Sequence, residues 1–220
     1  FEGSIVAYAF MTAFGGEMWM WSLIVVAYST PLIIGGVRRF LDKLNGWLLP
    51  IYFFGLIAAV IWAGVVYGFS DNWLTQAPEM PVPFAMGGPG WLATFAGYMG
   101  VWVLMMFTMD FAALGKRKDT KFHQWVSFGP VFYVLAFGFS AVVGIFLNFT
   151  IPGMEASETG IAGGLVTMMG LLGLLVVWTS QTRINTANYY LGAANLRAFG
   201  EKVFKISMPN IVWVLISSVI

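Results

Sequence analysis

The sequence contains no cysteine, and this absence excludes disulfide bonds, cysteine-ligated zinc and thiol catalysis. Charged residues make up only 10% of the chain. The single histidine, His123, lies in a basic stretch beside Gln124 and Trp125, where a surface role is favoured over a metal site. The sequence has no phosphate-binding loop, no serine–histidine–aspartate order and no metal-ligand spacing. We therefore expect neither an enzyme nor a protein that holds a metal or an organic cofactor.

Apolar residues make up 59% of the chain and aromatic residues 17%. This composition is typical of a chain whose solvent is mostly lipid. The net charge of +1 points to no nucleic-acid partner, because the basic residues are explained by membrane topology. We therefore expect an all-α integral membrane protein.

The charges alternate along the chain in a pattern that predicts its topology. Basic residues gather at 38–43, 116–121 and 197–205, whereas the connections between them carry acidic residues at 17, 71–79 and 155–158. By the positive-inside rule the basic groups are cytoplasmic. The predicted spans of this single transmembrane domain (1–220) are 1–14, 18–36, 47–69, 91–114, 125–147, 161–195 and 210–220. Both ends fall in apolar segments, so we expect a fragment of a longer multi-pass cell-membrane protein, and the compact loops fit a bacterial inner membrane.

Arg183 is the one basic residue inside a predicted span, and an ionisable group in the hydrocarbon normally marks a functional site. The same helix carries Gln181, Asn185 and Asn188 on one face, with Arg183 on the opposite side. A helix that is polar almost all round belongs at the centre of a bundle. The alternative is that the amides only hold neighbouring helices together.

Two further segments carry candidate residues. Gly100 lies mid-span just before Trp102 and permits a broken helix with free backbone groups, although small-residue packing is an equal alternative. Asp110 lies near the cytoplasmic end of that span. Glu2 lies about 20 Å from the outer surface, at ~1.5 Å per residue, and we expect Arg183 as its partner unless the chain end is frayed.

Two stretches resemble the nucleobase-cation symporters, a family that carries cytosine, purines, uracil, allantoin and hydantoins. They are Gly100-Val-Trp-Val-Leu-Met-Met-Phe-Thr-Met-Asp-Phe-Ala112, similar to the family's sixth span, and Arg183-Ile-Asn-Thr-Ala-Asn188, similar to its eighth. The resemblance covers the chain as spans three to nine of about twelve and implies a leucine-transporter-like fold with two inverted repeats. It further implies that Trp102 stacks on a planar ring, that Glu2 takes a hydrogen-bonding position, and that Asn185 or Asn188 binds the ring's amide edge.

One departure from the family concerns its sodium ligands. Relatives carry hydroxyl residues just before the first asparagine of the eighth span, whereas this chain has Arg183 and Ile184 there. We therefore expect a secondary-active permease for a heteroaromatic compound or cyclic ureide that is not sodium-coupled, with proton coupling left open. The predicted substrate-binding residues are Glu2, Gly100, Trp102, Gln181, Asn185 and Asn188, and Arg183 and Asp110 are the predicted internal charges. The alternatives are a transporter-like sensing domain of a signalling protein such as a sensor kinase, and a non-transporting subunit of a membrane complex.

Overall fold

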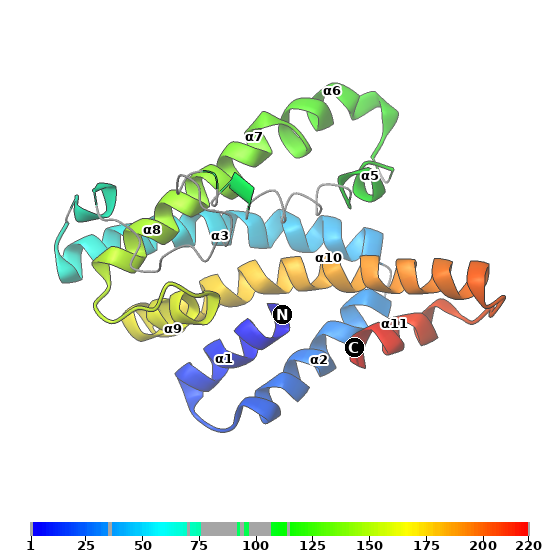
Figure 1. Ribbon diagram of the computed structural model, residues 1–220, viewed down its shortest axis with the longest axis horizontal. Helices are drawn as coiled ribbons and strands as arrows, with labels where there is room; N and C mark the ends of the chain where they lie inside the picture. The colour runs from blue at the N-terminus through cyan, green and yellow to red at the C-terminus, as the bar shows by residue number, and fades with distance from the viewer. Residues whose placement is uncertain are drawn as a thin grey trace. The chain divides into compact units, whose positions relative to one another are not determined.

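The computed structural model describes residues 2–34, 37–69, 71–75, 92, 95–96, 107–113 and 115–219. All regular secondary structure in these residues is helical (Figure 1), which confirms the predicted all-α class. The leucine-transporter topology stays a prediction. The chain divides into two compact units, residues 1–70 with 143–220 and residues 71–142.

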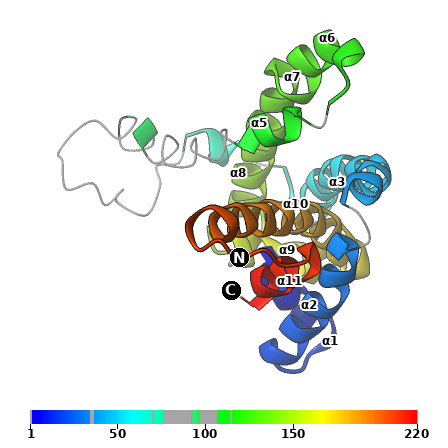
Figure 2. The same ribbon diagram turned by 90° about the vertical axis from the view of Figure 1, so that its right-hand side faces the viewer.

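The first unit is built around one long central helix. Its helices are α1 (Glu2–Phe14), α2 (Met18–Ile34), α3 (Val37–Tyr67), α9 (Glu158–Met169), α10 (Leu171–Val203) and α11 (Asn210–Val219), and α8 (Ser140–Thr150) leads into it. α10 packs against α1, α2, α3, α9 and α11 (Figures 1 and 2). The helix that the sequence predicted at the centre of a bundle is therefore surrounded by five others.

α1 and α2 form a hairpin that is closed by two glycines. Gly15 and Gly16 have φ values of 74° and 89°, which L-residues with side chains rarely adopt. The indole Nε1–H of Trp21 donates to the carbonyl of Gly15 at 2.7 Å, and the Trp21 ring stacks on Phe10 at 5.3 Å between ring centroids. These contacts hold the start of α2 against the end of α1.

α3 is apolar on two opposite faces. Leu56, Ala59 and Ala63 are buried on the face toward the interior of the unit. The other face carries exposed large apolar side chains at seven- and four-residue spacing: Trp47, Phe54, Ile61 and Val65.

The segments Gly46–Tyr67 and Arg117–Thr150 are helices long and apolar enough to cross a membrane, and they overlap the predicted spans 47–69 and 125–147.

The predicted span 161–195 is not one continuous helix. It is divided between α9 and α10 at Gly170, whose φ of 58° and ψ of −130° suit only glycine. Gly173 lies so close to α9 that an added Cβ would overlap the carbonyl oxygen of Leu165. The apolar periodicity of the sequence passes through this point without a break, so only the backbone conformation of Gly170 reveals the turn.

The second unit contains short helical segments, and those from Arg117 onward follow one another along the segment Arg117–Thr150. They are η1 (Asn72–Leu74), α5 (Phe107–Ala112), η3 (Arg117–Asp119), α6 (Thr120–Phe122), η4 (His123–Ser127), α7 (Pro130–Tyr133) and η5 (Val134–Phe139). In η4 the imidazole Nδ1 of His123 lies 3.0 Å from the hydroxyl of Ser127. This contact gives His123 a local hydrogen-bond partner within its own turn.

Candidate functional site

The side of α10 that faces the bundle interior carries polar side chains. Thr179, Thr182, Asn185 and Thr186 are all buried. The hydroxyl of Thr179 donates to the carbonyl of Val176 at 2.9 Å, and that of Thr186 donates to the carbonyl of Thr182 at 2.7 Å. Because these hydroxyl protons are used within the helix, the oxygens keep acceptor capacity toward the neighbouring helices.

α2 meets this polar side with two hydroxyl residues. The phenol oxygen of Tyr28 lies 3.1 Å from the hydroxyl of Thr182, and the Nδ2 of Asn185 donates to the hydroxyl of Ser29 at 3.4 Å. The second bond is long and correspondingly weak. Sequence reasoning missed both α2 residues, although three consecutive hydroxyl residues at 28–30 in an otherwise apolar helix are a signal that could have found them.

The first turn of α1 completes the arrangement. The Nδ2 of Asn188 donates to Oε1 of Glu2 at 2.9 Å. A Cβ placed on Gly3 would lie 3.8 Å from Nδ2 of Asn185 and 3.6 Å from Cγ1 of Val25, so this turn touches both α10 and α2. We call the joined set the polar seam, and its members are Glu2 of α1, Tyr28 and Ser29 of α2, and Thr182, Asn185 and Asn188 of α10.

An apolar cluster lies directly beside the polar seam. Val6, Ala7 and Val25 are buried at its core, and the aromatic rings of Phe10, Trp21, Tyr28 and Trp178 pack against it. The seam offers a carboxylate that accepts hydrogen bonds and carboxamides that both donate and accept. Polar groups of this kind beside aromatic rings suit a small planar ligand with N–H and C=O groups.

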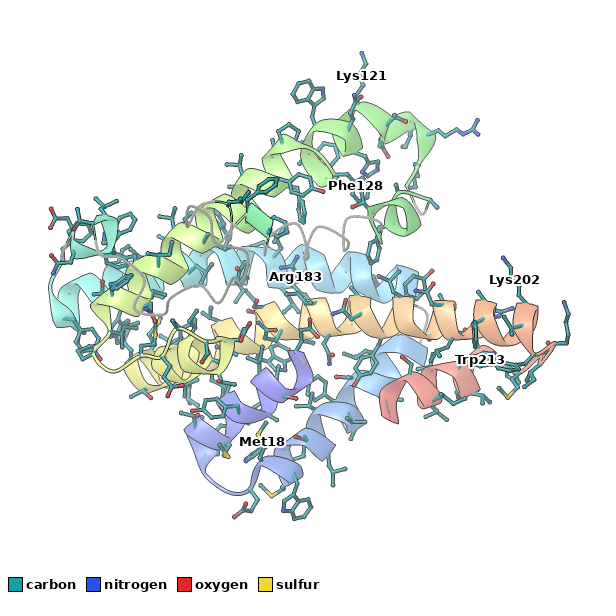
Figure 3. The ribbon with its side chains drawn as sticks, viewed as in Figure 1. Met18, Lys121, Phe128, Arg183, Lys202 and Trp213 are labelled. Atoms are coloured by element: carbon teal, nitrogen blue, oxygen red, sulfur yellow. The ribbon has the colours of Figure 1, made fainter. Side chains whose placement is uncertain are left out.

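Arg183 lies on a different side of α10. It follows Thr182 by about 100° around the helix and extends toward α3 (Figure 3), where it is half-buried within electrostatic range of Tyr52. Val176 packs on Gly55 of α3 at the same side, so closely that an added Cβ would overlap it. The structure therefore gives Glu2 a different partner from the one predicted, because the carboxylate bonds to Asn188 while the guanidinium faces α3.

The structure brings Glu2, Asn185 and Asn188 together as predicted site residues. Gln181 is half-buried one turn before Asn185. Gly100 and Trp102 lie outside the described residues. The backbone of Asp110 belongs to α5, but its side chain also lies outside the described part of the structure. Among the residues that the structure describes, no group of three histidine, aspartate or glutamate side chains is placed to hold a metal ion.

The comparisons with known proteins found no matching family model, no matching curated protein and no matching solved structure. The resemblance to the nucleobase-cation symporters therefore stays a prediction.

Proposed function

We propose that this chain belongs to a multi-pass membrane protein that carries a small nitrogenous ring compound, of the nucleobase or cyclic ureide class, by alternating access and without sodium coupling. The ring binds at the polar seam between α1, α2 and α10. Arg183 acts as an internal cation on the α3 side of α10.

Membrane insertion is supported by the exposed face of α3. A surface helix of a water-soluble protein carries polar residues on the face opposite its packed face. In α3 that face carries Trp47 at 78% exposure and Val65 at 80%, with Phe54 and Ile61 between them. Lipid is the solvent in which such a stripe is stable, and 22 residues of this helix are apolar enough to cross a bilayer.

The hydrogen bond between Glu2 and Asn188 is the single observation that carries the ligand proposal. A carboxylate within a membrane-spanning helix is expensive, so such residues usually face a substrate pathway. Here the carboxylate accepts from a carboxamide, which is the same kind of donor that the N–H edge of a cyclic amide presents. A bound ring can replace the Asn188 donor at Glu2 and leave the carboxamide to pair with a ring carbonyl.

The lack of sodium coupling is supported by the position of Arg183. Its guanidinium is always protonated and sits half-buried in α10, one residue from the seam member Thr182. A fixed positive charge repels a second cation, and this repulsion is stronger in a bundle interior than in water. The buried hydroxyl oxygens of α10 therefore lie close to a charge that opposes sodium.

The first test is a thermal-shift binding screen of the full-length protein with nucleobases, hydantoins and allantoin, each in sodium or in choline. We expect stabilisation by a ring compound that is the same in both salts, and its loss in Asn188→Ala. Asn195→Ala is the matched control, because Asn195 is an exposed asparagine of the same helix. Stabilisation that requires sodium would overturn the coupling proposal, and equal loss in both variants would overturn the site.

Uptake into liposomes then separates carriage from binding alone. A carrier concentrates or equilibrates the ring compound that stabilised it. Binding without uptake would instead favour a ligand-sensing membrane domain, and no binding by any ring compound would favour a non-transporting subunit.

A further inference from the structure

The corner where α10 ends combines exposed apolar side chains with lysines. α10 ends at Val203, and residues 204–209 turn the chain into α11. The exposed apolar side chains of this corner are Phe199, Val203, Phe204 and Ile206. Lys202 and Lys205 are exposed among them, and Figure 3 shows Lys202 at this end of α10. We call these six residues the α10–α11 corner.

The corner is a defined structure rather than a loose turn. The rings of Phe199 and Phe204 form an edge-to-face pair with centroids 5.3 Å apart and an interplanar angle of 84°. The carbonyl of Gly200 accepts from the N–H of Phe204 at 3.2 Å and from the N–H of Ile206 at 3.1 Å. Trp213 of α11 packs so tightly on Gly200 that an added Cβ would overlap the indole ring. The turn is therefore held from both helices.

Lys205 has an unusual backbone for its residue type. Its φ is 58°, and it is the one non-glycine residue with positive φ in the part of the chain that the structure describes. Glycine or asparagine takes this left-handed conformation more readily, and non-glycine residues are found there chiefly where the surrounding structure or function requires them. A lysine at this point adds positive charge to the turn at some conformational cost.

The charge of the corner comes from its two lysines. Nearby, Nε of Arg197 is paired with Oε1 of Glu201 at 2.8 Å, so this pair contributes little net field. Lys202 and Lys205 remain as the positive charges next to the exposed aromatic pair. Long lysine side chains can lay their stems along apolar surface while the ammonium groups reach a polar layer. Phenylalanine and other apolar side chains next to basic residues lie at the boundary between the headgroups and the acyl chains.

We propose that the α10–α11 corner binds an anionic phospholipid of the cytoplasmic leaflet. The two ammonium groups contact the phosphate region of the lipid, and the Phe199–Phe204 pair with Val203 and Ile206 contacts its upper acyl chains. The proposal rests on the membrane insertion included in the proposed function and on the predicted cytoplasmic side of residues 197–205. It does not depend on what the polar seam binds.

The experiment uses the absence of cysteine in the chain. Ser207 is exposed in the turn, so a cysteine introduced there by Ser207→Cys is the one thiol in this chain available for labelling. This cysteine is labelled with a bimane fluorophore, and the full-length protein is reconstituted in phosphatidylcholine bilayers. Quenching by doxyl-labelled phosphatidylglycerol is compared with quenching by doxyl-labelled phosphatidylcholine. We expect preferential quenching by the anionic lipid. The pair Lys202→Gln and Lys205→Asn should lower the preference for the anionic lipid about 25-fold, at roughly fivefold for each lysine.

The choice of variants keeps the outcomes separate. Asparagine at 205 tolerates the left-handed backbone, so a lost preference reports charge rather than misfolding. Lys116→Gln with Lys118→Gln is the matched control, because it removes two exposed lysines of another predicted cytoplasmic segment. Equal quenching by both lipids would overturn the lipid site. An equal loss of the anionic-lipid preference in the control variant would also overturn it. So would loss of that preference when inorganic phosphate is added. No quenching by either lipid would overturn the membrane placement itself.

Discussion

The hydrogen bond between Glu2 and Asn188 can be measured as a coupling energy. It joins α1 to α10 across the polar seam at 2.9 Å, so each partner contributes to the position of the other helix. Hydrogen bonds to charged groups contribute about 1.5–3 kcal/mol in favourable settings. Because Glu2 is half-buried and Asn188 is exposed, we expect the smaller range of ~0.6–1.7 kcal/mol found for polar contacts between transmembrane helices.

The perturbation is a double-mutant cycle of Glu2→Ala, Asn188→Ala and the double variant. Free energies of unfolding are measured on the full-length protein by titrating sodium dodecyl sulfate into detergent micelles and following helicity by circular dichroism. The expected coupling corresponds to a factor of about 3 to 20 in the unfolding equilibrium constant. The double variant should be less destabilised than the sum of the two single variants, because either single change already breaks the bond.

A second cycle on Arg197 and Glu201 provides the comparison. This ion pair lies within α10, four residues apart and largely exposed, so its coupling should stay near ~0.3–0.5 kcal/mol. The free-energy changes of two independent mutations add to within ~0.3–0.5 kcal/mol. A Glu2–Asn188 coupling energy no larger than this would therefore refute the reasoning. The carboxylate would then have no specific partner on α10, and the polar seam would lose the contact on which the ligand proposal depends.

Four other substitutions test separate parts of the structure. Gly173→Ala should destabilise the protein by about 1–3 kcal/mol, because the new methyl group overlaps the backbone of α9. Gly144→Ala, whose new methyl group meets no neighbouring side chain or other helix within 4 Å among the residues that the structure describes, should instead be neutral or stabilising by up to ~1 kcal/mol. Thermal unfolding of the two glycine variants checks the contrast. Tyr28→Phe should cost about 0.5–1.5 kcal/mol in the same assay by removing the hydroxyl contact with Thr182, and an unchanged stability would argue against that contact. Arg183→Ser should make ligand binding depend more on sodium, and an unchanged sodium response with binding intact would remove our account of this residue.

Much of the helical architecture is readable from local sequence. Long apolar runs predict helices, and the observed α1 and α2 begin and end within about two residues of the predicted spans 1–14 and 18–36. The positions of Asn185 and Asn188 on one side of their helix, with Arg183 on another, also follow from sequence, since helical geometry alone separates these residues.

Partners and breaks required the tertiary structure. The acceptor for Asn188 lies 186 positions away in the chain, and no periodicity relates the two residues. Electrostatic attraction made Arg183 the expected partner of Glu2, but α1 packs on one side of α10 and α3 on another, so the carboxylate and the guanidinium face different helices.

Gly170 shows the same division between local and tertiary information. Glycine is common within transmembrane helices, so its presence in an apolar run predicts no turn. The turn at Gly170 lets α9 pack against both α10 and α1. On the α1 side, Gly163 of α9 lies beside the ring of Tyr8. Local sequence predicts most of the helical segments and the polar face of a helix, because these depend on residues three and four apart. Which polar groups meet could be learned only from the folded bundle, because the pairing depends on how separate helices pack against one another.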